Sequence, residues 1–183
     1  MSSARAARSG RARSRQAPLA GIRLLVLDVD GVMTDGRLAY GLDGELGKSF
    51  HVRDGYGIKA ARAAGIEVAV ISGRQSAAVR WRCQELGIDH VYLGVEDKDA
   101  AFTGLLSTLA LAPRQCACIG DDAPDVPLLR QVGLAVAVAD AHPVALAAAH
   151  RRTRCAGGAG AVREVCDWLL TAHRGERAAR SRR

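Results

Sequence analysis

The stretch Ile22-Arg-Leu-Leu-Val-Leu-Asp-Val-Asp-Gly31 decides the fold, because an apolar run ends here in a carboxylate and is followed by a second acid and a glycine. Four further apolar runs resemble it, and Ala-rich or Leu-rich stretches of helical length lie between them. The expected strands are residues 22–28, 66–71, 90–93, 116–119 and 134–138, and the expected helices are 56–64, 75–86, 98–111, 125–131 and 161–172. Several of these strands are apolar on both faces, as parallel strands between helices are. The alternation predicts an α/β domain in which helices cover both faces of a parallel sheet.

The composition fits one folded domain with two basic ends. Of the 183 residues, 49% are hydrophobic and 25% are charged, which excludes collagen, a coiled coil and wholesale disorder. Of the net charge of +7, residues 1–17 carry +5 and residues 173–183 carry +4, which leaves −2 for residues 18–172. The basic ends lack interleaved aromatic residues, so nucleic acid is an unlikely partner. We expect a disordered basic tail over 1–17, the folded domain over 18–172 and a basic C-terminal tail over 173–183.

The sequence also bears on location. The chain has no apolar run near the ~20 residues of a membrane helix, and no apolar stretch of a signal peptide follows its basic start. We therefore expect a cytoplasmic protein without a membrane partner. The Arg- and Ser-rich start also resembles a transit peptide in composition, but it has no apolar face, which argues against that alternative. The five cysteines are odd in number and form no C-x-x-C pair, which argues against a disulfide framework and against a zinc site.

Polar side chains follow the ends of the expected strands. In parallel sheets, ligands bind outside the carboxyl ends of the strands, so these side chains should converge on one edge. They are Asp28, Asp30, Ser72, Lys98, Asp121, Asp122 and Asp125. Any one of the aspartates could simply cap a helix. Together they fit that interpretation poorly, because several carboxylates in one pocket repel each other and need a cation.

This set of residues fits phosphoryl transfer through an aspartyl phosphate, with Mg²⁺ among the carboxylates. Asp28 would be the nucleophile, and Asp30 would protonate the leaving group and later take a proton from water. Asp121 would join these two aspartates at the metal. The remaining roles are to hold the phosphoryl oxygens, for Ser72 and Lys98, and to orient Lys98 or metal-bound water, for Asp122 and Asp125.

Four ordered motifs resemble those of the haloacid dehalogenase superfamily of phosphatases. They are Asp28-Val-Asp-Gly31, Ser72-Gly-Arg74, Lys98 and Gly120-Asp-Asp-x-x-Asp125. The resemblance implies a Rossmann-like fold and Mg²⁺ as the cofactor. It also implies that the first aspartate is the nucleophile and that the aspartate two residues later is the acid and base, which binds Mg²⁺ through its backbone carbonyl. The first aspartate of the fourth motif would complete the metal site.

The spacing of the motifs leaves no room for a cap domain. One helix and one strand fill the interval 72–98, and the spare residues of the interval 28–72, about 34–53, form two strand-like halves around Gly41–Gly44. This pattern predicts a protruding β-hairpin, which is too small to be a lid. A selective phosphatase must hold its substrate and limit access of water. We therefore expect a neighbouring subunit to supply the lid, with the hairpins meeting one another.

A closer resemblance covers residues 20–173. The hairpin and the segments 50–58, 138–143 and 156–167 resemble the family of phosphatases of 3-deoxy-D-manno-octulosonate 8-phosphate. This family is a capless, homotetrameric subclass that acts in lipopolysaccharide biosynthesis. The resemblance implies a tetramer in which the adjacent subunit completes each site. His51 and Met33 depart from the residues usual in the family, Asn and Leu.

Arginines are the candidates for substrate choice, because the substrate would be a sugar acid phosphate and the arginine fork matches a carboxylate. The candidate substrate-binding residues are Asp30, Arg53, Gly73, Arg74 and Arg82. Arg53 is the most informative, because similar phosphatases of nine-carbon sialic-type acids have Thr-Ser-Asp-Ser where this chain has Val-Arg-Asp-Gly. A 9-phosphate of such an acid is the alternative substrate, and each arginine could instead be solvated or lie in an interface.

A phosphorelay receiver module is the alternative from another class. It has the same architecture and also uses a metal-bound phospho-aspartate, a hydroxyl side chain and a lysine. Its paired acids follow the first strand, however, whereas Asp121-Asp122 follow the fourth strand here. A long-lived phospho-switch also has no use for Asp30, so the sequence favours an enzyme.

Overall fold

The computed structural model describes residues 16–42 and 44–180. Most of the expected N-terminal tail lies outside these residues. Ala17, at its end, is attached to the domain, because its backbone N–H donates to the carbonyl of Gly133 at 2.7 Å. Within the described residues, no helix is both long and apolar enough to cross a membrane.

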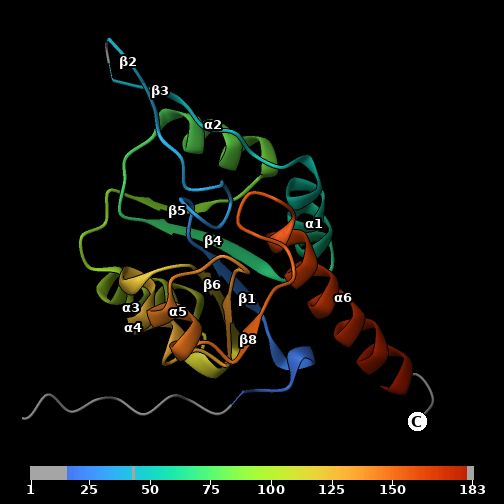
Figure 1. Ribbon diagram of the computed structural model, residues 1–183. Coiled ribbons are helices and arrows are strands. Elements are labelled where there is room, and N and C mark those ends of the chain that lie inside the picture. The colour runs from blue at the N-terminus through green and yellow to red at the C-terminus, as the bar shows by residue number, and fades with distance from the viewer. Residues whose placement is uncertain (1–15, 43, 181–183) are drawn as a thin grey trace, which may run out of the picture.

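Six strands form one parallel sheet in the order β5-β4-β1-β6-β7-β8 (Figure 1). They are β1 (Leu24–Leu27), β4 (Glu67–Ser72), β5 (His90–Leu93), β6 (Cys116–Gly120), β7 (Leu134–Ala137) and β8 (Arg151–Arg152). All four residues of β1 are buried, as expected for an apolar strand with helices on both sides. Leu27 pairs with Val70 on one side and with Ile119 on the other. The register therefore brings the carboxyl ends of β1, β4 and β6 to the same edge of the sheet.

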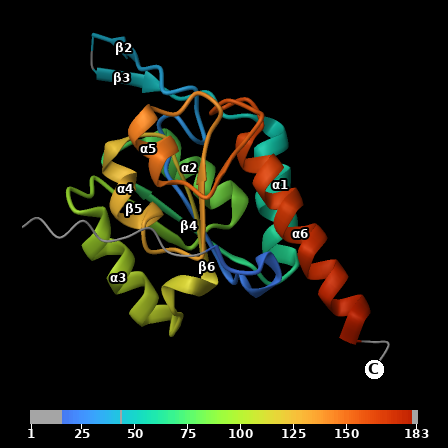
Figure 2. The same cartoon turned by 60° about the horizontal axis from the view of Figure 1, so that its bottom comes forward.

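Helices cover both faces of the sheet, as the sequence predicts. They are α1 (Val52–Ala63), α2 (Ala77–Leu86), α3 (Lys98–Leu109), α4 (Val126–Leu129), α5 (Pro143–Ala148) and α6 (Ala161–Arg180), with short 3₁₀ turns at Leu19–Gly21, Pro113–Gln115 and Ala123–Asp125. In Figure 1, α1, α2 and α6 lie on one face and α3, α4 and α5 on the other. Both views show α1 and α6 side by side (Figure 2). A glycine of α1 makes this close packing possible, because a Cβ at Gly57 would lie 3.1 Å from the Cα of Arg163.

Two of the expected helix boundaries are wrong by four residues or more. The first helix begins at Val52 and not at Tyr56, because the ring of His51 accepts a hydrogen bond from the Arg53 N–H and caps the helix. The last helix continues past Ala172 to Arg180, so residues 173–180 of the expected C-terminal tail are helical. Arg, Ala and Glu dominate this segment and are strong helix formers. Helix α5 and the edge strand β8 were not expected.

The predicted hairpin is confirmed and protrudes from the carboxyl edge of the sheet (Figures 1 and 2). Its strands, β2 (Ala39–Gly41) and β3 (Gly44–Gly47), pair antiparallel as a separate two-stranded sheet. The intervals between the motifs hold no cap domain in the part of the chain that the structure describes. All five cysteines are free, and four of them are buried.

Candidate active site

The strand ends bring four charged side chains into direct contact. Carboxylate oxygens of Asp28, Asp121 and Asp125 all lie within 4.8 Å of one another. The Lys98 ammonium donates to Asp28 Oδ1 at 2.6 Å and to Asp125 Oδ1 at 2.7 Å. We call these four residues the aspartate cluster. It confirms the expected convergence of strand-end residues on one edge of the sheet.

Local structure fixes each member of the aspartate cluster. Lys98 is the first residue of α3, whose N-terminus is capped by Asp97. The Asp125 carboxylate contacts Lys98 through one oxygen and accepts the Asp121 backbone N–H through the other at 2.9 Å. Asp125 therefore joins Lys98 to the loop that begins at Asp121. Gly31 is required where it stands, because its φ is +91° and a Cβ there would overlap the Asp121 carboxylate.

The charges of the aspartate cluster are poorly balanced by the protein alone. Burial, and then the charge of Asp125, raise the pKa of Asp28 to about 7. Burial, followed by the charges of Asp28 and Asp125, likewise raises the pKa of Asp121 to about 7. For Lys98, burial alone would disfavour the ammonium, but Asp28 and Asp125 outweigh it and raise the pKa of the lysine. One buried cation thus faces three carboxylates.

A hard divalent cation fits this arrangement. The ligand atoms are carboxylate oxygens, which Mg²⁺ prefers. Asp121 lies against Gly31 and hence beside the backbone of the loop that follows β1. The side chain of Asp30 is not part of the aspartate cluster. This is compatible with the sequence resemblance, which implies that Asp30 binds Mg²⁺ through its backbone carbonyl.

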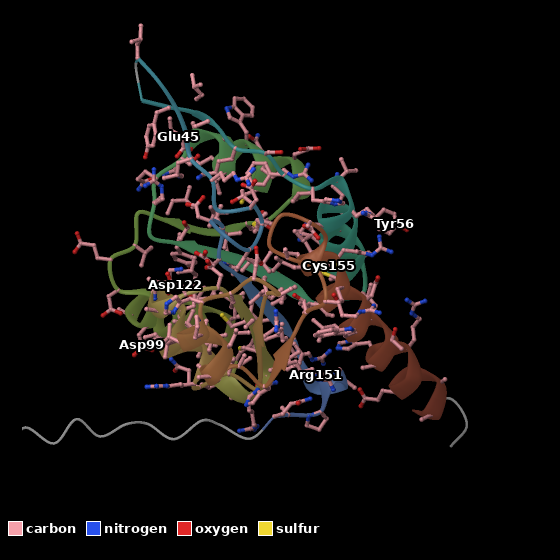
Figure 3. The ribbon with its side chains drawn as sticks, in the orientation of Figure 1. Glu45, Tyr56, Asp99, Asp122, Arg151 and Cys155 are labelled. Carbon is pink, nitrogen blue, oxygen red and sulfur yellow. The ribbon has the colours of Figure 1, made fainter. Side chains whose placement is uncertain are left out.

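Asp30 instead contacts the base of the hairpin. Lys48 Nζ donates to Asp30 Oδ1 at 2.5 Å and lies 3.5 Å from Glu45 Oε2. Arg74 approaches from the loop after β4, with its Nε 3.7 Å from Asp30 Oδ2. Glu45, on the hairpin near the start of α2 (Figure 3), accepts a hydrogen bond from Ser76 Oγ at 2.7 Å. We call Asp30, Glu45, Lys48, Arg74 and Ser76 the hairpin network.

The sequence does not identify Lys48 and Glu45 as residues of the site. Charged residues of a hairpin are normally solvated, and neither residue belongs to a motif or follows a strand of the main sheet. The Lys48 side chain is nevertheless only 1% exposed. The one available signal was its place a few residues beyond the glycine-bounded turn, which is too general to indicate a site.

Two other residues of the predicted set lie at the same edge with different surroundings. Ser72 ends β4, is buried, and accepts the Arg74 backbone N–H at 3.4 Å through its hydroxyl oxygen. The Asp122 side chain is 56% exposed and caps the following 3₁₀ turn, and it lies 3.6 Å from His142 Nδ1 (Figure 3). Asp122 thus faces His142 and solvent. Of the two aspartates expected to orient Lys98 or metal-bound water, only Asp125 contacts Lys98.

The three candidate arginines lie in different places. Arg74 is at the edge of the site, where it donates to Tyr40 Oη at 3.0 Å. Arg53 is exposed and lines a cavity of about 290 Å³ whose other walls belong to α6 and the preceding loop. Arg82 pairs with Glu85 at 2.8 Å and borders a cavity of about 560 Å³ that Lys48 also lines. Within one chain, these arginines do not converge on a single ligand.

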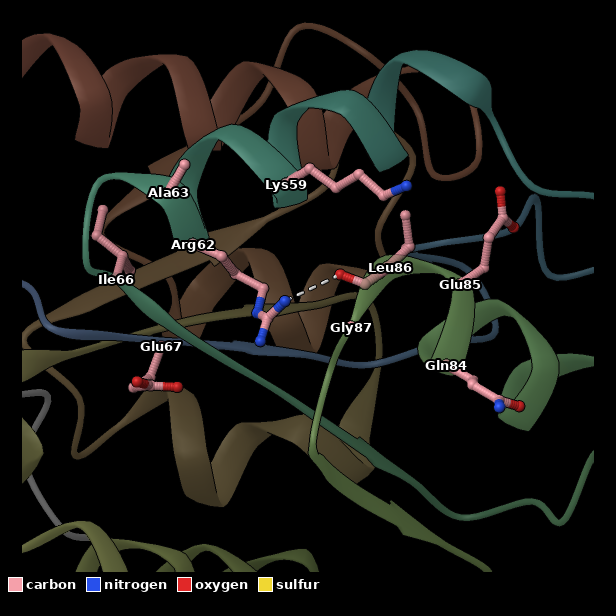
Figure 4. Close-up of a pocket in the computed structure, with 9 residues that line it drawn as sticks. All are labelled: Lys59, Arg62, Ala63, Ile66, Glu67, Gln84, Glu85, Leu86 and Gly87. Atoms are coloured by element: carbon pink, nitrogen blue, oxygen red, sulfur yellow. Dashed lines mark hydrogen bonds between the residues drawn. The ribbon is translucent and has the colours of Figure 1, made fainter.

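Gly73 is exposed, and a Cβ there would meet only Val95 O at 3.7 Å, an ordinary contact. Crowding within the protein therefore does not require a glycine at this position. A second cavity of about 560 Å³ lies between α1 and α2, where Arg62 donates to Leu86 O at 3.2 Å (Figure 4). None of the candidate site residues lines it.

The glycine-rich segment 157–160 supports the loop that carries the first motif. A Cβ at Gly157 would overlap the carbonyl oxygen of Gly31, and the Gly158 N–H donates to Val32 O at 3.0 Å. The Gly157 N–H donates to Asp140 at 2.9 Å. These contacts give the segment a structural role beneath the first motif.

Comparison with known proteins shows the family of this chain. The model of the haloacid dehalogenase-like hydrolase family matches residues 94–164. The 3-deoxy-D-manno-octulosonate 8-phosphate phosphatase KdsC of Escherichia coli K12 is 56% identical over 151 residues, which cover 82% of this chain and 80% of that protein.

Solved structures point to the same family. The crystal structure of a 3-deoxy-D-manno-octulosonate 8-phosphate phosphatase from Yersinia pestis is 54% identical, with a TM-score of 0.83, and the match covers 85% of this chain and 84% of that one. The phosphatase of the same name from Moraxella catarrhalis was solved in complex with a magnesium ion, a phosphate ion and a KDO molecule. It is 39% identical, with a TM-score of 0.84, and the match covers 90% of this chain and 94% of that one. The chain thus belongs to the family of 3-deoxy-D-manno-octulosonate 8-phosphate phosphatases, within the haloacid dehalogenase-like hydrolases.

Proposed function

We propose that this protein is a Mg²⁺-dependent phosphatase that hydrolyses 3-deoxy-D-manno-octulosonate 8-phosphate to 3-deoxy-D-manno-octulosonate and phosphate in lipopolysaccharide biosynthesis. The observation that carries the proposal is the aspartate cluster, in which Lys98 holds Asp28 at 2.6 Å beside Asp121. This cluster occurs in a chain that is 56% identical to KdsC of Escherichia coli. Its residues are of the types that phosphoryl transfer through an aspartyl phosphate requires.

Asp28 is the nucleophile in this mechanism, and Asp28, Asp121 and the backbone carbonyl of Asp30 are the residues that would hold Mg²⁺. The metal would offset the negative charge that otherwise repels a phosphate dianion from the carboxylates. One oxygen of Asp28 is fixed by Lys98, which leaves the other to attack the phosphorus. The bond between phosphorus and the sugar oxygen then breaks.

Asp30 carries the protons. In the first step its carboxyl group gives a proton to the leaving sugar oxygen, which contributes on the order of 10²–10⁴-fold to the rate. In the second step its carboxylate takes a proton from the water that attacks the phosphorus of the aspartyl phosphate. The bond between phosphorus and Asp28 breaks, and the Asp28 carboxylate and inorganic phosphate are released.

Ser72 and Lys98 hold the phosphoryl oxygens during transfer. The Ser72 oxygen already accepts the Arg74 backbone N–H, so its hydroxyl hydrogen is available to a phosphoryl oxygen. The Lys98 ammonium has two of its three hydrogens on Asp28 and Asp125, which leaves one for the substrate. Fixed donors of this kind are most useful where charge develops in the transition state.

The sugar acid end of the substrate is the proposed ligand of Arg53, Gly73, Arg74 and Arg82, together with Asp30. The position of Arg74 beside Asp30 supports its proposed role in substrate binding. Arg53 is the sharpest test, because Arg53→Ala should lower kcat/KM for the sugar acid phosphate far more than for an aryl phosphate without a carboxylate. An equal loss on both substrates would refute a substrate-specific role.

We also propose a homotetramer in which a neighbouring subunit closes each site. Every exposed large apolar side chain among the described residues belongs to the hairpin, to the first turns of α1 or to α2: Leu38, Tyr40, Leu42, Leu46, Val52, Tyr56 and Trp81. Exposed apolar side chains that gather on a few neighbouring elements are typical of an interface between subunits. Light scattering that finds an active monomer would contradict this assembly. The five free thiols support a reducing compartment, the cytoplasm.

The experiment that tests the function compares turnover of 3-deoxy-D-manno-octulosonate 8-phosphate and a sialic acid 9-phosphate, each with Mg²⁺ and with a chelator. We expect efficient hydrolysis of the first substrate only, and none in the chelator. Comparable rates on the two substrates would support the nine-carbon alternative. Activity that survives chelation would contradict the metal dependence.

A further inference from the structure

The hairpin network holds the carboxyl group of Asp30 through one oxygen only. Lys48 Nζ donates to Oδ1, while Oδ2 is buried and has no hydrogen-bond partner among the described residues. Arg74 Nε lies 3.7 Å from Oδ2, which is too long for a hydrogen bond. One oxygen of Asp30 is therefore held by Lys48, and the other has no hydrogen-bond partner among the described residues.

Lys48 is itself held in place. Its side chain is 1% exposed, and a second carboxylate, Glu45 Oε2, lies 3.5 Å from its Nζ. Glu45 in turn accepts from Ser76 Oγ at 2.7 Å and from Arg74 at 3.4 Å. These contacts join the hairpin to the loops that follow β1 and β4. A lysine buried between two acids keeps one position, whereas a solvated lysine samples many rotamers.

We infer that Lys48 is a positioning residue, which holds the Asp30 carboxyl group so that Oδ2 reaches the leaving oxygen of the substrate. The inference rests on the proposed function, in which Asp30 protonates that oxygen. As Asp28 attacks and the bond from phosphorus to the leaving oxygen breaks, the proton passes from Asp30 Oδ2 to the leaving oxygen. Proton transfer requires hydrogen-bond reach, and a misplacement of about 1 Å costs roughly 10²-fold in rate.

If Lys48 positions Asp30, its replacement should slow a substrate more when the leaving group of that substrate has a greater need for a proton. Phenyl phosphate and p-nitrophenyl phosphate have nearly the same shape, but their leaving groups differ. Phenol is as weak an acid as a tyrosine side chain, with a pKa of about 10, so its departure gains from protonation. Nitrophenolate is much more stable and leaves without a proton.

The test is the ratio of kcat/KM for these two esters in Lys48→Met, which keeps the apolar stem of the side chain. The kcat/KM value reports transfer of the phosphoryl group to Asp28 and not the later hydrolysis. We expect about a 10–100-fold loss for phenyl phosphate and less than about a threefold loss for p-nitrophenyl phosphate. An equal loss on both esters, as a binding or purely structural role would give, overturns the inference, and so does no loss on either.

Two further variants keep the test decisive. Lys48→Gln is the alternative if Lys48→Met does not fold, because its amide is polar but ends one atom short of the ammonium. It carries the same expectation and the same refutation. Lys59→Met is the matched control, because Lys59 is an exposed lysine of α1 and lines the cavity between α1 and α2. We expect it to leave both kcat/KM values unchanged.

Circular dichroism and thermal melting establish that each variant is folded before its rates are compared. Turnover of 3-deoxy-D-manno-octulosonate 8-phosphate by the unmodified protein tests the proposed function separately. If that protein hydrolyses the sugar phosphate and the ester ratio does not change in the Lys48 variants, only the role of Lys48 is overturned. If it hydrolyses none of the phosphate esters, both fail.

Discussion

Replacing Lys98 with methionine would remove the buried ammonium that contacts Asp28 at 2.6 Å and Asp125 at 2.7 Å. Methionine has a similar length and an apolar stem, so the substitution mainly removes charge and hydrogen bonds. Breaking a buried ion pair on one side typically costs about 3–5 kcal/mol, because the remaining charge is left uncompensated. In a domain of this size each kcal/mol shifts Tm by about 2–4 °C, so Lys98→Met should lower Tm by roughly 6–20 °C in a chelator.

The loss should depend on pH. The pKa of Asp28 is about 7 in the folded protein, above its unfolded value, so the carboxyl is mostly neutral at pH 5 and charged at pH 8. The part of this stability that comes from the Lys98–Asp28 pair should therefore be small at pH 5 and largely present at pH 8, so the total loss should be larger at pH 8. Thermal denaturation of Lys98→Met, Lys59→Met and the unmodified protein at both pH values measures the difference. A loss below about 1 kcal/mol at pH 8, or an equal loss at pH 5, would refute the reasoning about buried charge.

Three further predictions concern the loop, the metal and the hairpin. Gly157→Ala should lower both Tm and activity, because its Cβ would overlap the carbonyl of Gly31. The control Gly104→Ala has open space in the middle of α3 and should raise the free energy of unfolding by about 0.5–1 kcal/mol. Similar melting curves for the two variants would contradict this. The pKa of Asp121 is raised to about 7, so stability without metal is full below its unfolded pKa of 3.8 and is lost as the pH rises through 7. The rise in Tm on adding Mg²⁺ should accordingly be larger at pH 8 than at pH 5.5, and an equal rise at both would count against a carboxylate metal site. Leu46→Ser removes an exposed apolar side chain from the hairpin and should shift light scattering toward smaller species; an unchanged mass would place the interface elsewhere.

Much of the site could be predicted from the sequence because strand ends are informative. The apolar runs of β1, β4, β6 and β7 are buried, and in a parallel sheet their carboxyl ends must share an edge. Asp28 and Asp121 meet there for that reason, and Asp125 joins them because its carboxylate accepts the Asp121 N–H. Lys98 donates to both Asp28 and Asp125 and offsets part of their negative charge. The α1–α6 packing could not be seen in the same way, because two glycines in α1 weaken its helical pattern.

The remainder depends on contacts between distant parts of the chain. Strand β8 consists of two exposed arginines that extend the edge of the sheet, so it has no apolar signal. The end of α6 has many charges, and His173 holds it to the domain through the carbonyl of Ile22 at 2.9 Å. Lys48 reaches Asp30 only because the hairpin folds back on the loop after β1. Such long-range contacts leave no periodic pattern in the sequence.

The most direct test of the central claim is to locate the phosphoryl group during turnover. A rapid-quench reaction of the unmodified protein with Mg²⁺ and 3-deoxy-D-manno-octulosonate 8-phosphate, followed by mass spectrometry of its peptides, would reveal a covalent intermediate. We predict a phosphoryl group on the peptide that contains Asp28, formed before free phosphate accumulates and absent in Asp28→Asn. Phosphate release without any modified peptide, or full activity of Asp28→Asn, would contradict the assignment of Asp28 as the nucleophile.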